Sequence, residues 1–202
     1  MAEREDRKRH KRVEILQSAA AAFRRRGYHG ATTEQIAHSL RMTKGSLYYY
    51  FKDKEEILFF CHDYSLDIIL ELLERVEASG KAADEKLREL LVAFVHMIID
   101  ELRGTALTLD LKALSPEHLS AVIAKRDRFD KGLRRIVQEG MDAGLFAAAD
   151  PKLRSFAMLG AVNWISRWFD PRGLASSDEI ARGFADYLVA GLRASALRSA
   201  RG

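Results

Sequence analysis

The segment Thr43–Phe51 concentrates residue types that contact phosphates and bases: hydroxyls, one cation and three consecutive tyrosines. In a helix of about 3.6 residues per turn, the core side carries Leu47, Tyr50 and Phe51, and the outer side carries Lys44, Ser46, Tyr48 and Tyr49. Thr43 can cap this helix by accepting the backbone N–H of Ser46. Because the unpaired N–H groups of a helix start attract anions, the segment indicates a surface that binds phosphate.

A second short helix is predicted just upstream, over Thr33–Leu40. Thr32 and Gln35 form a capping-box pattern at its start. Only two residues, Arg41 and Met42, separate the two helices, which is the pattern of a helix-turn-helix whose second helix enters the DNA major groove. Any small helical bundle contains such pairs, so periodicity alone leaves a purely structural pair equally open.

The charge distribution favours nucleic acid as the partner. Residues 1–54 hold 13 Lys or Arg and 6 Asp or Glu, whereas the remaining residues hold 20 and 23. Positive charge concentrated at one end of a chain is the electrostatic footprint of nucleic-acid binding. Six of the first twelve residues are Lys or Arg. This run is either a solvated, disordered tail or an arm that lies along phosphates or in a minor groove.

Catalytic and metal-binding patterns are weak. Cys61, His62 and Asp63 are consecutive, and consecutive helical residues diverge by about 100°, so they do not converge on one site. The six histidines show no ligand spacing, and no glycine-rich phosphate loop follows a strand. We therefore expect no enzyme, no metal site and no resident cofactor.

The remaining pattern is helical throughout. Helices are predicted over about Arg9–Arg26, Asp53–Ser79, Asp84–Arg103, Ala106–Leu114, 116–143, 151–169 and 176–197, with stops at Gly27, Gly80, Gly104 and Gly144. With the two short helices this gives an all-α chain of about nine helices. We expect a DNA-binding domain over residues 1–54 and a ligand-binding and dimerisation domain over residues 55–202, with the helix from Asp53 belonging to both.

Nothing in the sequence predicts export or membrane insertion. The N-terminal residues are charged and contain no apolar core of a signal peptide. The longest apolar stretch, Leu90–Ile99, is interrupted by His96 and is too short to span a bilayer. A single cysteine, Cys61, fits a reducing compartment. The expected location is the cytoplasm.

The run from Val13 to Lys54 resembles the N-terminal domain of TetR-family transcriptional regulators. The similar motifs are AFRRRGYHGATTEQIA and MTKGSLYYYFKDKEEIL, with Arg41 at the turn position that usually holds glycine. A left-handed conformation at that turn costs a non-glycine residue about 1 kcal/mol. The resemblance implies a homodimeric regulator, most often a repressor, that binds a palindromic double-stranded DNA operator and pairs through its last two helices.

The resemblance also implies which side chains meet DNA. The expected DNA-binding residues are Thr32, Thr33, Thr43, Lys44, Ser46, Tyr48, Tyr49, Tyr50 and Lys54. Hydroxyls and cations would hold phosphates, and the tyrosines would also contact thymine methyl groups.

The second half is similar to a TetR subgroup that senses acyl-CoA thioesters in fatty-acid and sterol-ring catabolism. The similar motifs are RFDKGLRRIV, GMDAGLF and NWISRWFDPRG. Such a ligand needs an apolar tunnel, a stacking surface for adenine and guanidinium groups for phosphates. The residues expected to bind it are Phe94, Met97, Ile98, Leu107, Leu111, Phe129, Trp164, Arg167, Trp168 and Arg172. For the apolar members and both tryptophans, ordinary core packing is the alternative.

Two other functions stay open at this point. The effector of the same regulator could instead be a hydrophobic, drug-like molecule. The chain could also be a helical ligand-binding or scaffolding dimer that does not recognise DNA, although the charge of residues 1–54 and the intact segment Thr43–Phe51 speak against this.

Overall fold

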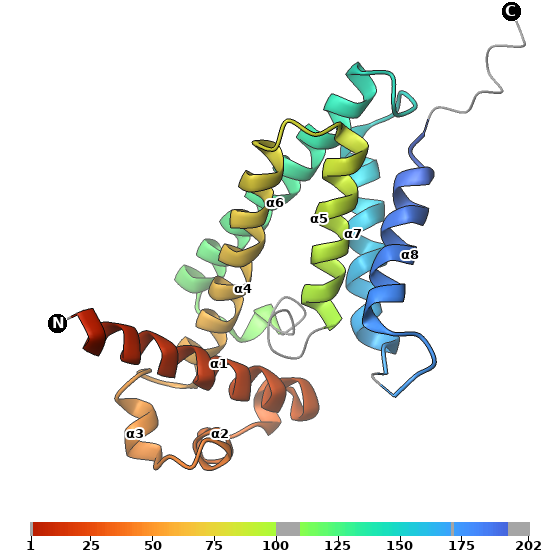
Figure 1. Ribbon diagram of the computed structural model, residues 1–202. Coiled ribbons are helices and arrows are strands. Elements are labelled where there is room, and N and C mark those ends of the chain that lie inside the picture. Colours follow the sequence, from red (N-terminus) through yellow and green to blue (C-terminus); the bar gives the residue numbers. More distant parts are fainter. Residues whose placement is uncertain (1, 100–109, 171, 194–202) are drawn as a thin grey trace, which may run out of the picture. The chain divides into compact units, whose positions relative to one another are not determined.

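Every regular element is a helix in the residues that this computed structural model describes, which are 2–99, 110–170 and 172–193. The α-helices, labelled in Figure 1, are α1 (Ala2–Gly30), α2 (Thr33–Ser39), α3 (Lys44–Tyr48), α4 (Lys54–Glu77), α5 (Ala83–Ile99), α6 (Pro116–Asp142), α7 (Pro151–Trp168) and α8 (Ser177–Ala190). A short 3-10 helix, η2, covers Leu111–Ala113. Phe146 and Arg193 form an isolated β-bridge. The predicted all-α class is confirmed.

These helices form two compact units. One holds the described residues up to Asp67 together with residues 110–125, and the other holds residues 68–99 and the described residues from Arg126 onward. Helices α4 and α6 are therefore each divided between the units, α4 after Asp67 and α6 after Lys125. This division concerns packing, so the expected assignment of DNA binding to residues 1–54 remains a prediction.

The core of the first unit lies where α1, α2, α3 and the start of α4 meet. Its fully buried side chains include Ile15, Phe23, Ile36, Leu47 and Phe51. Figure 1 shows α1 running across α2 and α3 in this unit. The expected core role of Leu47 and Phe51 is confirmed, because each is at most 1% exposed.

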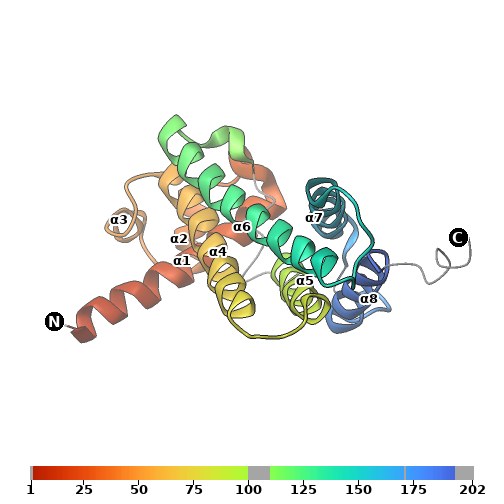
Figure 2. The ribbon, with the colours of Figure 1, turned by 90° about the horizontal axis from the view of Figure 1, so that it is seen from above.

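In the second unit α5 packs against both α7 and α8, as Figure 2 shows from above. Leu87, Leu90 and Leu91 line the buried side of α5. The last part of α4 lies against α6, and a Cβ at Gly132 of α6 would collide with the Leu73 side chain. Burial of these apolar faces is the main force that stabilises such a helical unit.

Several predicted boundaries are wrong. Helix α1 begins at Ala2 instead of Arg9, so the basic run at the N-terminus is helical. Gly27 still interrupts α1, with a φ of 69°. Helix α3 is five residues long instead of nine, because the chain turns after Tyr48 and the N–H of Tyr50 bonds to the carbonyl of Leu47 at 2.9 Å.

The C-terminal predictions need similar corrections. Helix α8 ends at Ala190 instead of about Leu197, because the chain leaves the helix and the N–H of Ala147 bonds to the carbonyl of Leu192 at 2.8 Å. The predicted helix Ala106–Leu114 lies partly outside the described residues, and its described part is the 3-10 helix η2. Likewise, α5 is described to Ile99, and its predicted end at Arg103 lies outside the description.

Searching the described helices for one that is long and apolar enough to cross a membrane finds none.

Candidate nucleic-acid interface

The starts of α2 and α3 are capped as the sequence predicts. The N–H of Gln35 bonds to the Thr32 hydroxyl at 3.2 Å, and the Gln35 side chain accepts the N–H of Thr32 at 3.3 Å, which completes a capping box. The N–H of Ser46 bonds to the Thr43 hydroxyl at 3.1 Å. Thr32, Thr43 and Ser46 are all exposed, so their hydroxyls can also meet a ligand.

The turn between α2 and α3 is left-handed at Arg41, whose φ is 52°. The N–H of Arg41 bonds to the carbonyl of His38 at 3.0 Å, and the N–H of Met42 bonds to the carbonyl of Ala37 at 2.9 Å. This pair of bonds is the Schellman motif, which normally places glycine at the left-handed position. The helix-turn-helix therefore forms despite the strain at Arg41.

The three tyrosines differ in exposure. Tyr49 is 62% exposed and Tyr48 is 41% exposed, whereas Tyr50 is half-buried. The Tyr50 ring meets the Tyr49 ring edge-on, with 5.1 Å between centroids. Tyr50 therefore supports Tyr49 from behind, and Tyr48 and Tyr49 are the two rings available to a partner. Together with Thr32, Thr43, Lys44 and Ser46, they form what we call the recognition surface.

Lys44 is already paired in the free protein. Its ammonium forms a salt bridge with Glu34 of α2, and this contact lowers the pKa of the Glu34 carboxyl to about 2. The same hydrogen bond raises the pKa of Lys44. Both side chains are about half exposed, so a phosphate can compete with Glu34 for the ammonium.

Thr33 and Lys54 are turned inward. Thr33 is buried, and its hydroxyl lies 3.4 Å from the Tyr48 hydroxyl. The Lys54 ammonium donates to the carbonyls of Tyr28 at 2.9 Å and Ala31 at 3.1 Å. Lys54 thus holds the loop that leads into α2. Phosphate contacts by Thr33 and Lys54 remain predictions, and each has a positioning role that sequence reasoning missed.

Two cations of α1 also reach this region and were not among the predicted site residues. The Lys8 ammonium lies over the Tyr49 ring, 5.4 Å from its centroid. The Arg12 guanidinium stacks on Phe60 at 4.1 Å and on Phe51 at 4.9 Å. Their i, i+4 spacing in the basic run was the available signal, but only tertiary packing shows which rings they meet.

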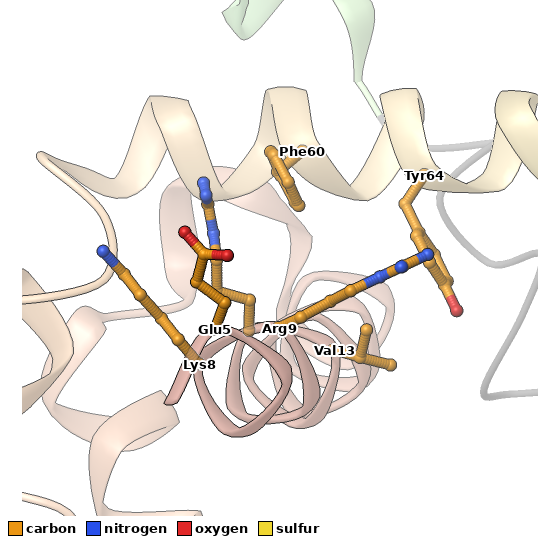
Figure 3. Close-up of a pocket in the computed structure, with 7 residues that line it drawn as sticks. Glu5, Lys8, Arg9, Val13, Phe60 and Tyr64 are labelled. Atoms are coloured by element: carbon orange, nitrogen blue, oxygen red, sulfur yellow. The ribbon is translucent and has the colours of Figure 1, made fainter. Parts of the chain in front are cut away.

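A groove of about 380 Å³ runs between the N-terminal part of α1 and α4 (Figure 3). Phe60 and Tyr64 of α4 face it from one side, and Arg9 of α1 extends toward Tyr64. Lys8 leaves α1 in the opposite direction from Arg9. The groove is therefore open and polar on its α1 side.

The residues expected to bind an apolar effector fall into several groups. Phe94, Met97, Ile98 and Phe129 are all buried in the second unit, and the rings of Phe94 and Phe129 lie 5.3 Å apart. Leu111 is half-buried in the first unit. Leu107 lies outside the described residues.

The aromatic and cationic residues at the end of α7 are on the surface. Trp164 is 64% exposed and Trp168 is 46% exposed, so neither belongs to the core of this chain. The Trp168 ring stacks on Phe184 of α8 at 6.0 Å. Arg167 is exposed, and Arg172 donates to Asp170 at 3.1 and 3.2 Å, which lowers the pKa of the Asp170 carboxyl.

The exposed side of α7 carries several apolar residues along its length, together with the polar residues Lys152, Asn163 and Arg167. We call this the α7 face, formed by Leu153, Phe156, Ala157, Gly160, Trp164 and Trp168. A Cβ at Gly160 would meet nothing within 4 Å, and the same holds for Gly183 on α8. Beside Gly183, Tyr187 is 80% exposed. Large apolar side chains that are exposed together on one helix indicate an interaction site.

Cys61, His62 and Asp63 do not form a catalytic group. The first two are buried, and burial raises the pKa of the Cys61 thiol, while Asp63 pairs with Lys125 at 2.5 Å. In the described ranges, no group of three or more His, Cys, Asp or Glu side chains is arranged to hold a metal ion.

Comparison with known proteins agrees with these features. Residues 15–59 match the family model described as bacterial regulatory proteins of the tetR family, and residues 80–192 match the tetracyclin repressor-like C-terminal domain. The HTH-type transcriptional repressor KstR2 of Mycolicibacterium smegmatis is 26% identical over 188 residues, which cover 92% of each chain.

Two solved structures are similar over nearly the whole chain. The TetR family transcriptional regulator PfmR from Thermus thermophilus is 32% identical with a TM-score of 0.79, covering 89% of this chain and 99% of PfmR. AibR in complex with isovaleryl coenzyme A and operator DNA is 28% identical with a TM-score of 0.77, covering 90% of this chain and 98% of AibR.

Proposed function

The chain belongs to the TetR family of bacterial transcriptional regulators, and on that premise we propose that it represses genes as a homodimer on a palindromic operator and is released by an acyl-CoA thioester. DNA binding is the property of the family. The homodimer, the operator symmetry and the effector are the further parts of the proposal, and each is supported by a separate observation.

The observation that carries the DNA part is the recognition surface. Tyr48 and Tyr49 are exposed on the second helix of a helix-turn-helix, beside two capped helix starts and the Lys44 cation. Hydroxyls, backbone N–H groups and a cation fix a protein on phosphates, and aromatic rings can contact thymine methyl groups. Few other ligands would use all of these groups together.

The α7 face supports the homodimer. Leu153, Phe156 and Trp164 are each at least 50% exposed, and exposing such side chains to water is unfavourable by about 25 cal/mol for each Å² of apolar surface. Gly160 and Gly183 leave room for a second chain to approach α7 and α8 closely. Two recognition helices about one DNA turn apart, roughly 34–36 Å, would then read a palindrome.

The effector proposal rests on AibR, whose structure contains isovaleryl coenzyme A, and on the buried aromatic cluster of the second unit. We assign the acyl group to the cluster of Phe94, Met97, Ile98 and Phe129. These side chains are apolar and buried, and Met97 can adapt its shape to a ligand. Leu107 and Leu111 remain proposed tunnel residues.

We assign the coenzyme part to the end of α7. Arg167 and Arg172 can bind its phosphates, and Trp168, at the C-terminal end of the α7 face, can stack on adenine, whereas Trp164 is assigned to the dimer. Arg172 would exchange its Asp170 partner for a phosphate. Replacing both arginines by alanine should abolish release by acyl-CoA and leave operator binding intact. Unchanged release would refute this assignment.

The coupling of the two sites is proposed to pass through the first turn of α4. Glu55 accepts the N–H of Ser115 at 2.7 Å and lies 2.9 Å from Nδ1 of His118, whose ring stacks on Phe59 at 3.9 Å. The adjacent Lys54 holds the loop before α2. Since α4 and α6 both continue into the second unit, a ligand that moves them there would also move the recognition surface.

The experiment that tests this function is a titration of the operator complex with acyl-CoA thioesters of several chain and ring types. The DNA would come from the region upstream of the protein's own gene, and free CoA and the free acids are the controls. Release by thioesters alone is the expected result. Release only by apolar molecules without CoA would favour a drug-like effector. A protein without any specific DNA complex would instead fit a scaffolding dimer.

A further inference from the structure

The N-terminal part of α1 carries positive charge that the helix-turn-helix does not account for. Residues 5–12 contain five Lys or Arg and two acidic residues. In the structure they form helix α1, and residues 5–10 are all exposed. Within this run Lys11 pairs with Glu14 and Arg12 stacks on Phe51 and Phe60, so the role of Lys8 is still to be explained.

Lys8 has no acidic or carbonyl partner among the described residues, in contrast to Lys11, Lys44 and Lys54. Lys11 is paired with Glu14, Lys44 with Glu34, and Lys54 with two backbone carbonyls. The Lys8 ammonium instead lies over the exposed ring of Tyr49. An ammonium that is held beside the recognition surface but not neutralised is well placed for an anion.

The helical form of this run decides between two kinds of DNA contact. A basic arm that enters the minor groove must fit a channel of about 6 Å, whereas an α-helix with its side chains is about 10–12 Å across. Since α1 is helical from Ala2, this run cannot insert there as a helix. The phosphate backbone is the part of the duplex that a helix can reach from outside the groove.

We propose that Lys8 is a further DNA-contacting residue, whose ammonium binds a backbone phosphate next to the segment that Tyr49 reads. The inference rests on the proposed function, because it requires that the recognition surface binds DNA. It adds a contact from α1 to those of α2 and α3. It also assigns Tyr49 a second role, since its ring holds the Lys8 ammonium toward the phosphate.

The test is the salt dependence of DNA affinity, measured on a duplex that the wild-type protein selects from random-sequence DNA. Lys8→Gln is compared with the charge-preserving Lys8→Arg. Lys131→Gln, which removes an exposed lysine from the second unit, controls for net charge. Each phosphate contact contributes about −0.9 to the slope of log K against log salt. Lys8→Gln should therefore make the slope shallower by about 0.9 per protomer and weaken binding roughly five- to tenfold per site at 0.1 M salt.

Lys8→Arg and Lys131→Gln should both keep the wild-type slope. A Lys8→Gln variant with an unchanged slope would overturn the inference, even if its affinity fell, because such a loss would mean that Lys8 only positions Tyr49. If the wild-type protein enriched no duplex at all, the proposed function and this inference would both be refuted. Wild-type binding with an unaltered variant slope refutes this inference alone.

Discussion

The recognition surface and the α7 face both expose aromatic rings, but different groups surround those rings. Tyr48 and Tyr49 stand among hydroxyls, capped helix starts and the cations Lys44 and Lys8. Trp164 and Trp168 share their face with Leu153, Phe156, Ala157 and Gly160. Exposed rings alone do not identify a partner, but the residues around them do. Charges and hydroxyls favour the phosphates of a nucleic acid, whereas apolar side chains favour another protein surface.

The largest expected effect comes from placing a charge on the α7 face. Trp164→Glu would bury an unpaired carboxylate in the proposed dimer, which costs several kcal/mol. We expect the dimer dissociation constant to rise about a hundredfold or more, as measured by sedimentation equilibrium. Ile123→Glu places the same charge at an exposed apolar site of the first unit and should leave the dimer intact. If Trp164→Glu dimerised as tightly as the wild-type protein, the α7 face would not be the dimer interface.

The second prediction compares the removal of an exposed tyrosine ring from the recognition surface with the removal of one from the second unit. Tyr49→Ala removes a ring from the recognition surface and should weaken operator binding about tenfold to a hundredfold, since each good base contact is worth about 1–3 kcal/mol. Tyr187→Ala removes another exposed ring, on α8. At protein concentrations that keep the dimer formed, it should leave operator affinity unchanged, as measured by fluorescence anisotropy. Intact operator binding by Tyr49→Ala would mean that the recognition helix is misassigned.

A smaller effect is expected from the carboxylate inside the recognition surface. Glu34→Gln would release Lys44 and remove a negative charge that faces DNA phosphates. Operator affinity should rise about threefold, because solvent screens the effect of one exposed charge pair. Because the pKa of Glu34 is lowered to about 2, its carboxylate stays ionised down to that pH. The gain from Glu34→Gln should therefore be the same at pH 8 and pH 4.5. A gain that shrinks at pH 4.5, where a glutamate with the ordinary pKa of 4.5 is half protonated, would contradict the pairing.

The smallest effect concerns the turn that sets the angle of α3. Arg41→Gly should raise the free energy of unfolding by about 1 kcal/mol, because glycine adopts the left-handed conformation without strain. Arg25→Gly is the matched control on α1, where the same substitution should lower it by about 1 kcal/mol through the loss of helix propensity. Both changes are measured by thermal and urea unfolding. If Arg41→Gly lowered the free energy of unfolding, the arginine side chain would have to make a contact that stabilises the fold by more than the backbone strain destabilises it.

Local patterns in the sequence predicted a large part of this structure. The caps at Thr32, Thr43 and Ser176 depend on neighbouring residues, and all three are confirmed. The ends of α3 and α8 were misplaced because distant contacts decide them. Phe51 is buried in the core of the first unit, and the Leu192 carbonyl accepts the N–H of Ala147 across the second unit.

The candidate site shows the same limit. Exposure of Tyr48 and Tyr49 followed from helical spacing, and it is confirmed. The bonds of Lys54 to Tyr28 and Ala31, and the contact of Lys8 with Tyr49, join residues more than twenty positions apart. No local pattern encodes such contacts. The sequence could also not predict that Trp164 and Trp168 lie on the surface, because two tryptophans at i, i+4 are compatible with a core and with an interface.

The most direct test of the two-surface account is a hydroxyl-radical footprint of the protein on its selected duplex, combined with the mass of the complex in solution. The account predicts two protomers per duplex and two protected segments about one helical turn, roughly 34–36 Å, or a small multiple of it apart. Trp164→Glu should lose this paired pattern, and Tyr49→Ala should weaken both segments equally. One protomer that protects a single segment, in the wild-type protein, would contradict the account.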